Sequence, residues 1–115
     1  MTAPTPLDTL GRAKYVSLTT FRSDGTPVAT PVWVVRDDAV LRILTDPASG
    51  KVRRLRADPR VRLSPCDMRG RVKEGALVAD GTAVLDDEEG TARTMEMIER
   101  RYGLMGRILG WLNAR

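Results

Sequence analysis

Residues 14–35 read KYVSLTTF-RSDGT-PVATPVWVV and contain the clearest indication of the fold class. Its first and last segments, 14–21 and 27–35, are rich in β-branched and aromatic residues, which favour strands. The Asp-Gly pair between them supplies the positive φ that a tight hairpin turn needs. The stretch therefore predicts two antiparallel strands. The second should be irregular at Pro31, because proline has no N–H to donate to the ladder.

Strand and helix signals continue on both sides of this hairpin. Thr5, followed by proline, favours a helix start near the N-terminus. Ser49 favours the start of a second helix over residues 50–57. The remaining strand patterns span residues 39–45, 60–66 and 76–85. Five short strands in series, with one helix between the third and the fourth, predict a mainly β (α+β) domain built as a small antiparallel barrel.

The C-terminal part of the chain, from Asp86 onward, has a helical pattern. Gly103 should break or kink this helix. An amphipathic helix of this kind is typical of an element that covers the barrel or a partner subunit. Its apolar stripe, with alternating spacings of three and four residues, consists of Met95, Ile98, Tyr102, Met105, Leu109 and Leu112.

The composition limits the classes of function. A chain of 115 residues fits one domain, residues 1–115. It has no apolar run long enough for a transmembrane helix, and its first residues do not resemble a signal peptide. One cysteine and no histidine exclude an internal disulfide, a cysteine-cluster or histidine-ligated metal site and a Ser-His-Asp triad. We therefore expect a cytoplasmic protein with no membrane contact and no metal, whose chemistry would come from a borrowed cofactor.

Basic residues concentrate in the middle of the chain. Residues 51–73 hold nine Lys and Arg against two Asp, whereas residues 74–89 hold six acids and no base. Such a segment favours an anionic partner: a phosphate, a carboxylate-rich ligand or a nucleic acid. A nucleic acid is disfavoured, because no aromatic residue between Trp33 and Tyr102 could stack on bases. The alternative is a solvated face that pairs with the acidic segment.

The sharpest local feature is Ser49-Gly50-Lys51, followed by Arg53 and Arg54. It lies where a loop enters the expected helix, and helix N-termini bind anions through unpaired amides and the positive end of the helix dipole. Gly50 would let the backbone approach a phosphate, and Lys51 would add a charge. The alternative is an ordinary serine-capped helix on the surface.

Two further side chains have alternative interpretations. Trp33 could fill the core or stack on an aromatic cofactor, and core filling is favoured. Cys66 is typical of a small buried hydrophobic residue, although nearby arginines could lower the pKa of its thiol. Neither side chain identifies a reaction by itself.

Five blocks in fixed order carry a resemblance to a known family. They are YVSLTTF (15–21), DGTP (24–27), TPVWVV (30–35), SGKVRRL (49–55) and DPRVRL (58–63). Together they resemble the pyridoxamine 5′-phosphate oxidase-like split-barrel flavoproteins, over roughly residues 8–105. More narrowly, the chain is similar to the branch of coenzyme F-420 (deazaflavin)-dependent oxidoreductases.

The resemblance implies a split β-barrel that forms a homodimer, with two cofactor sites at the subunit interface. The residues expected to flank the cofactor ring are Thr30, Pro31, Val32 and Trp33. Those expected to hold a phosphate or an acidic tail are Ser49, Gly50, Lys51, Arg53 and Arg54. The extra arginines favour coenzyme F-420, whose tail carries several carboxylates, with FMN as the alternative cofactor.

The resemblance also implies an oxidoreductase, in which reduced deazaflavin passes a hydride to a small unsaturated substrate. An FMN-dependent oxidase-like protein and a non-catalytic cofactor binder are the alternatives, because the family contains both. No side chain stands out as a proton donor, so the sequence assigns no catalytic residue. In relatives, the chain continues from the C-terminal helices into a last strand, and this sequence shows no such strand. One barrel edge is therefore expected to be open or covered by the partner.

Overall fold

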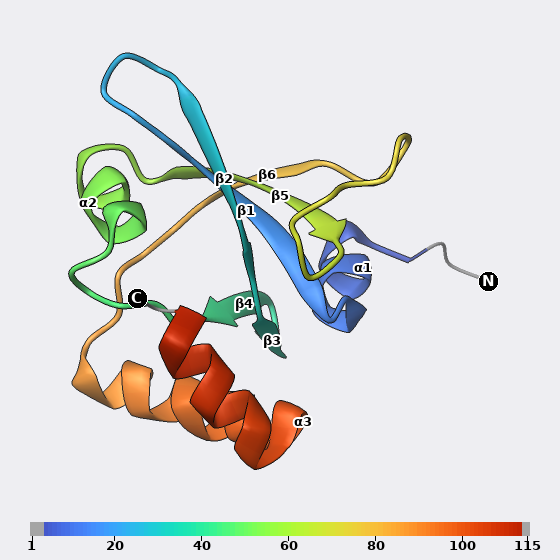
Figure 1. Cartoon of the computed structure of the whole chain (residues 1–115), viewed down its shortest axis with the longest axis vertical. Coiled ribbons are helices and arrows are strands. Elements are labelled where there is room, and N and C mark those ends of the chain that lie inside the picture. The colour runs from blue at the N-terminus through green and yellow to red at the C-terminus, as the bar shows by residue number, and fades with distance from the viewer. Residues whose placement is uncertain (1–3, 114–115) are drawn as a thin grey trace.

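The computed structural model describes the backbone of residues 4–113 and the side chains of residues 4–103. Figure 1 shows a long β-hairpin crossed by further strands, with helices at three sides of the sheet. The helices are α1 (Pro6–Arg12), α2 (Gly50–Ala57) and α3 (Glu88–Asn113). The strands are β1 (Tyr15–Phe21), β2 (Pro27–Val32), β3 (Val34–Asp37), β4 (Val40–Ile43), β5 (Arg60–Cys66) and β6 (Ala79–Thr82).

The described strands form two antiparallel sheets. One sheet has four strands in the order β2-β1-β5-β6, and the other consists of β3 and β4. The single strand predicted over 27–35 is therefore wrong, because Trp33 divides it into β2 and β3, which belong to different sheets. The predicted irregularity at Pro31 is also misplaced, since Pro31 stays in the ladder opposite Ser17. Proline is tolerated there because β2 is an edge strand.

Local sequence signals placed several elements correctly. The helix predicted over 50–57 is α2, and the strand predicted over 60–66 is β5. Thr5 caps α1 in a complete capping box with Asp8. The strand predicted over 76–85 is shorter, because β6 pairs only with the first four residues of β5.

The core lies on one face of the four-stranded sheet. Strand alternation puts Val16 and Leu18 of β1 on this face, where they meet Val61 of β5. Leu10 of α1 and Leu55 of α2 close the same cluster. Burial of these side chains supplies most of the favourable free energy of folding. It also fixes α2 beside β1, where the candidate site forms (Figure 1).

A second core cluster joins α3 to β3. It contains Trp33, Val35 and Ile98, with Tyr102 packed against them. The predicted kink is confirmed, because Gly103 has φ 75° and ψ −169°, outside the helical region. Of the predicted apolar stripe, Ile98 is buried and Tyr102 packs against the core, whereas the side chains of Met105, Leu109 and Leu112 lie outside the described residues.

Across the described part of the chain, no helix combines the length and the apolar character that spanning a membrane requires.

Candidate functional site: a cationic cluster at the start of α2

The N-terminus of α2 is built by a serine cap, as the sequence predicted. Ser49 has extended backbone angles, and its Oγ accepts a hydrogen bond from the backbone N–H of Val52 at 3.4 Å. The Oγ of Ser49 also lies 3.4 Å from Oγ1 of Thr45. The first turn of α2 contains no acidic residue. The positive end of the helix dipole is therefore left without a carboxylate from its own helix.

Arg54 folds back along α2 toward Gly50. Its Nε donates a hydrogen bond of 2.6 Å to Oγ1 of Thr20, which is fully buried on β1. A Cβ added to Gly50 would lie only 3.0 Å from Nη1 of Arg54. The φ of Gly50 is not in the left-handed region. Glycine at this position therefore provides room for the guanidinium, not an unusual backbone conformation.

Four basic side chains gather around this point. Lys51 and Arg54 are partly buried, while Arg22 of the β1–β2 turn and Arg53 are exposed. Burial lowers the pKa of the Lys51 ammonium, and repulsion by Arg54 lowers it further. Burial, followed by repulsion from Arg22 and Arg53, likewise lowers the pKa of the Arg54 guanidinium.

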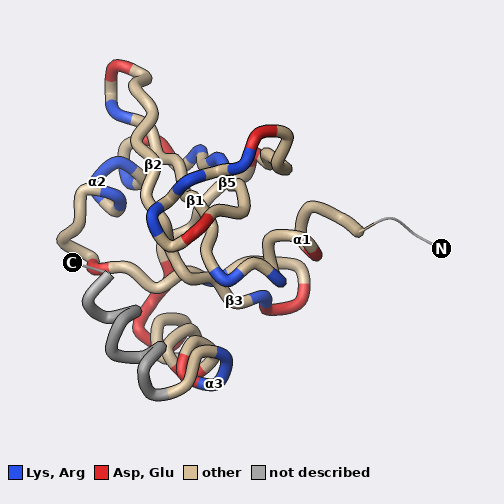
Figure 2. The backbone as a smooth tube through the Cα atoms, turned by 45° about the vertical axis from the view of Figure 1, so that its right-hand side comes forward, with Lys and Arg blue, Asp and Glu red and all other residues tan. Residues whose placement is uncertain are grey.

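We call Arg22, Lys51, Arg53 and Arg54 the cationic cluster. Within residues 4–103, none of the four forms an ion pair with a carboxylate. Figure 2 shows how basic residues follow α2 and continue along β5. Positive charges that are partly desolvated and repel one another are unfavourable unless an anion binds among them. The donor set therefore fits a phosphate or a carboxylate.

The residues expected beside a cofactor ring occupy the end of β2 and the break before β3. Thr30 lies opposite Leu18 in the β1–β2 register, and Thr20 lies two residues further along β1. Because side chains alternate along a strand, Thr20, Thr30 and Val32 share one face of the sheet, and Pro31 lies on the other. The Oγ1 atom of Thr30 is buried and has no hydrogen-bond partner among the residues that the structure describes. Through the contact between Thr20 and Arg54, the start of α2 lies on the same sheet face as Thr30 and Val32, which is the face that carries the core, whereas Pro31 lies on the opposite face.

Trp33 packs as a core residue. The residue is 7% exposed, and its ring stacks on Tyr102 with centroids 4.6 Å apart and an interplanar angle of 8°. The hydroxyl of Tyr102 donates to the backbone carbonyl of Val34 at 2.9 Å, which fixes the stacking ring in place. The Nε1 atom of Trp33 is buried and finds no hydrogen-bond partner within residues 4–103. Core filling, the favoured interpretation of this residue, is what the structure shows, and one indole face is already covered.

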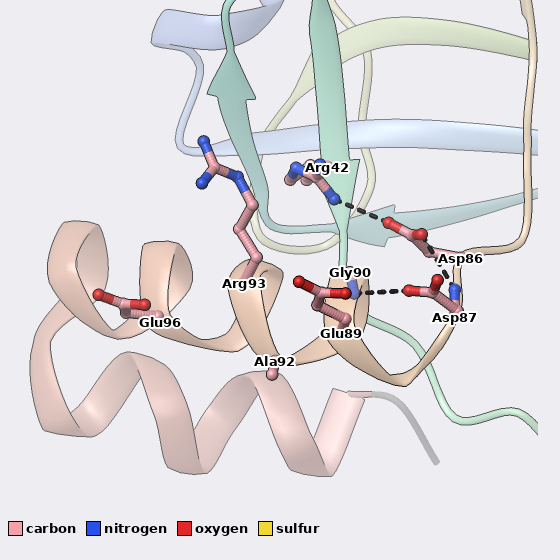
Figure 3. A pocket seen from close by; sticks show the side chains of 8 residues that line it. All are labelled: Arg42, Asp86, Asp87, Glu89, Gly90, Ala92, Arg93 and Glu96. Carbon is pink, nitrogen blue, oxygen red and sulfur yellow. Dashed lines mark hydrogen bonds and ion pairs between the residues drawn. The ribbon is translucent and has the colours of Figure 1, made fainter.

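A second polar region, which the sequence did not indicate, lies at the start of α3. A groove of about 480 Å³ is lined there by both acidic and basic side chains. Its charged residues are Arg42, Asp86, Asp87, Glu89, Arg93 and Glu96 (Figure 3).

The two arginines of this groove are already paired. Arg42 donates to Asp86 and to Asp37 at 2.8 Å each, and Arg93 donates to Asp37 at 2.8 Å. Hydrogen bonds from Arg93 and then Arg42 hold the pKa of the Asp37 carboxyl far below its usual value. No spacing rule could have shown this network, because its members come from β3, β4, the connection before α3, and α3 itself. It is a less suitable anion site than the cationic cluster.

The described residues provide neither an activated nucleophile at Cys66 nor a cluster of metal ligands. Cys66 is partly buried, and burial raises the pKa of its thiol, so the structure does not activate it as a nucleophile. Within the described residues, no three or more His, Cys, Asp or Glu side chains gather as they would around a metal ion.

Fold and site together define a class: a small, mainly antiparallel β protein with flanking helices and a partly buried cationic cluster beside the sheet. The sequence profile described as pyridoxamine 5′-phosphate oxidase matches residues 7–108, so the chain belongs to that family. This match confirms the expected family and the split-barrel fold class.

Solved structures support the same fold. HutZ, described as the heme storage protein from Vibrio cholerae, matches with a TM-score of 0.67 and 19% identity, over 89% of this chain and 76% of HutZ. A second solved chain matches with a TM-score of 0.59 and 25% identity, over 87% of this chain and 78% of that one. At these identities the likeness is one of fold. The comparison with curated protein sequences gives no match.

Proposed function

We propose that this protein binds a phosphate-bearing flavin-type cofactor, coenzyme F-420 with FMN as the alternative, and acts as an oxidoreductase on a small unsaturated substrate. The observation that carries the proposal is the cationic cluster, whose four charges have no carboxylate partner among the described residues. Membership of the pyridoxamine 5′-phosphate oxidase family supports it independently.

The chain's own residues would bind and orient the cofactor. Lys51 and Arg54 would pair with its phosphate, in charge-assisted hydrogen bonds that are about twice as strong as neutral ones. Gly50 would keep the space for the Arg54 guanidinium, and Ser49 would hold the helix end in place. The segment Thr30, Pro31, Val32 and Trp33 would border the ring through its backbone, because the side chains of Val32 and Trp33 are buried in the core. When bound, the deazaflavin or flavin ring supplies the hydride.

Coenzyme F-420 is the preferred ligand because the cationic surface extends beyond what one phosphate requires. Lys51 and Arg54 are partly buried and suit the phosphate, whereas Arg22 and Arg53 are exposed around them. Exposed arginines in this position suit the additional carboxylates of a deazaflavin tail. FMN would leave them without an anionic partner.

A second copy of the chain is the partner we expect, with the cofactor bound between the two. The strands β2 and β6 are sheet edges, and edges of this kind are usually covered. Exposed apolar side chains near β6 support a buried interface: Val78, Val84 and Leu85 are 58%, 87% and 44% exposed. Sedimentation or light scattering measures this association, and a monomer at micromolar concentration would contradict it.

Haem is a weaker alternative, suggested only by the description of HutZ. Haem iron is usually held by His, Cys, Met or Tyr, and this chain has no histidine. Its cysteine is partly buried with a raised thiol pKa, which opposes ligation as a thiolate. The cationic cluster gives no reason to prefer haem over a phosphate-bearing cofactor.

The test is a titration of the purified protein with oxidised coenzyme F-420 and, separately, with FMN. The wild type should bind one of them with micromolar or tighter affinity, and Lys51→Ala should bind it about tenfold more weakly or worse. Lys73→Ala is the matched control, because it removes the same charge from an exposed position outside the cluster. Equal affinities of Lys51→Ala and the wild type would overturn the site. Turnover with reduced cofactor then separates an enzyme from a binding protein.

A further inference from the structure

The contact between Thr20 and Arg54 joins two parts of the molecule that are 34 residues apart. Thr20 has no exposed surface and lies on β1, which is paired with β2 on one edge and β5 on the other. Its Oγ1 accepts the Nε–H of Arg54 at 2.6 Å. The arginine that faces the start of α2 is therefore anchored to an interior strand of the sheet.

The group that holds Arg54 is the neutral hydroxyl of Thr20, and this leaves the charge of the guanidinium available for a ligand. A carboxylate in the same place would hold the guanidinium and also cancel its charge. A hydroxyl orients the guanidinium through Nε and leaves its net charge in place. It also leaves the two terminal nitrogens for other partners, and Nη1 lies 3.0 Å from the position that a Cβ on Gly50 would take.

We propose that Thr20 is a positioning residue for anion binding, which holds the Arg54 guanidinium in the orientation that receives the cofactor phosphate. This inference rests on the proposed function, because it names how one residue of that site is oriented. Thr20 would not touch the cofactor itself. It would reduce the conformational freedom that Arg54 must lose when the phosphate binds.

The experiment compares each cofactor with its phosphate-free form. FMN is titrated beside riboflavin, and coenzyme F-420 beside the deazaflavin chromophore without its phosphate-linked tail. In Thr20→Val, which keeps the shape but removes the hydroxyl, affinity for the phosphate-bearing form should fall by about three- to tenfold. Affinity for the phosphate-free form should stay unchanged. Thr20→Ser keeps the hydroxyl and should retain wild-type affinity.

A double-mutant cycle shows whether Thr20 acts through Arg54. In an Arg54→Ala background, Thr20→Val should cause no further loss of affinity, because the group that it positions is already gone. Arg54→Lys gives a second test at a partly exposed position. It keeps the charge but lacks the Nε–H and both terminal nitrogens, so it should lose at least as much affinity as Thr20→Val.

The outcomes separate this inference from the proposed function. If Arg54→Ala weakens phosphate-dependent binding while Thr20→Val and Arg54→Lys bind like the wild type, the positioning role is wrong and the site stands. Equal losses for the phosphate-bearing and phosphate-free forms in Thr20→Val would also overturn the role, because they indicate a general structural effect. If Arg54→Ala and Lys51→Ala both bind like the wild type, the site itself is wrong.

Discussion

Arg42 and Arg54 both lie near a threonine hydroxyl, but within the described part of the chain only Arg42 is also paired with carboxylates. Each places a guanidinium nitrogen near a threonine hydroxyl: Arg42 near Thr94 at 3.4 Å and Arg54 near Thr20 at 2.6 Å. Arg42 is also paired with two aspartates, whereas Arg54 has no carboxylate partner among the described residues.

The pKa shifts of the two guanidinium groups record this difference. Hydrogen bonds from the Arg42 guanidinium to Asp37 and then to Asp86 raise its pKa. Burial and the repulsion of neighbouring arginines lower the pKa of Arg54. One region is a completed ion-pair network that joins α3 to the second sheet. The other lacks the negative charge that would complete it, and we expect the ligand to bring that charge.

The largest effect should come from giving the cationic cluster a carboxylate of its own. Arg53→Glu reverses one charge near the start of α2, so cofactor affinity should fall by more than about tenfold. The melting temperature of the free protein should rise, because an acid near a helix N-terminus is favourable and the repulsion of Arg54 is relieved. Arg56→Glu on the same helix is the control. If cofactor affinity falls equally in both variants, the loss is due to the change in net charge. The proposed difference between the cationic cluster and the paired Arg42 region would then be wrong.

Removing a carboxylate from the ion-pair network around Arg42 should lower the stability of the protein and leave cofactor binding unchanged. Asp37→Asn removes the carboxylate shared by Arg42 and Arg93, so the melting temperature should fall by a few degrees while cofactor affinity stays within about twofold of wild type. A large loss of affinity in this variant would show that the two regions are coupled.

The pH dependence of the melting temperature tests the paired region without any ligand. The pKa of the Asp37 carboxyl is lowered in the folded protein. Its contribution to the free energy of unfolding is therefore complete above the ordinary value near 3.8 and is lost as pH falls through the lower, folded value. Melting temperatures measured between about pH 2 and pH 6 should fall less steeply in Asp37→Asn than in the wild type. Parallel curves would contradict the assignment.

A smaller effect should follow from filling the space beside Arg54. The Cβ of Gly50→Ala would crowd Nη1 and displace the guanidinium, so cofactor affinity should fall by about two- to fivefold. Stability should not fall, because alanine favours helix more than glycine does. Calorimetric titration and thermal unfolding measure the two quantities. A destabilised Gly50→Ala protein would mean that this glycine is needed for the backbone.

The smallest effect should distinguish the two cofactors. Arg22 is exposed, so Arg22→Ser should weaken binding of coenzyme F-420 by about twofold through its tail carboxylates. FMN affinity should not change measurably. An equal loss of affinity for both cofactors would mean that Arg22 contacts the phosphate that they share, and not the carboxylates of the tail.

Local signals explain what the sequence predicted well. The α2 helix has its own start signal in Ser49 and its own stop signal in Asp58 before a proline, and both act within a few residues of the chain. The contact between Thr20 and Arg54 has no such signal, because it depends on how α2 packs on β1. The division of 27–35 at Trp33 also depends on tertiary packing, since the indole turns toward Tyr102 and Ile98 of α3.

The stacking of Trp33 on Tyr102 has an optical consequence. The chain contains two tryptophans, Trp33 and Trp111, so Trp111→Phe leaves a single indole whose surroundings are known. Its N–H is buried with no acceptor in the described part of the chain, so its emission should lie toward the blue and shift to the red if α3 leaves β3. Light emitted there overlaps the absorbance of flavins and deazaflavins. The protein therefore carries its own fluorescent reporter both of helix docking and of a coloured cofactor arriving nearby.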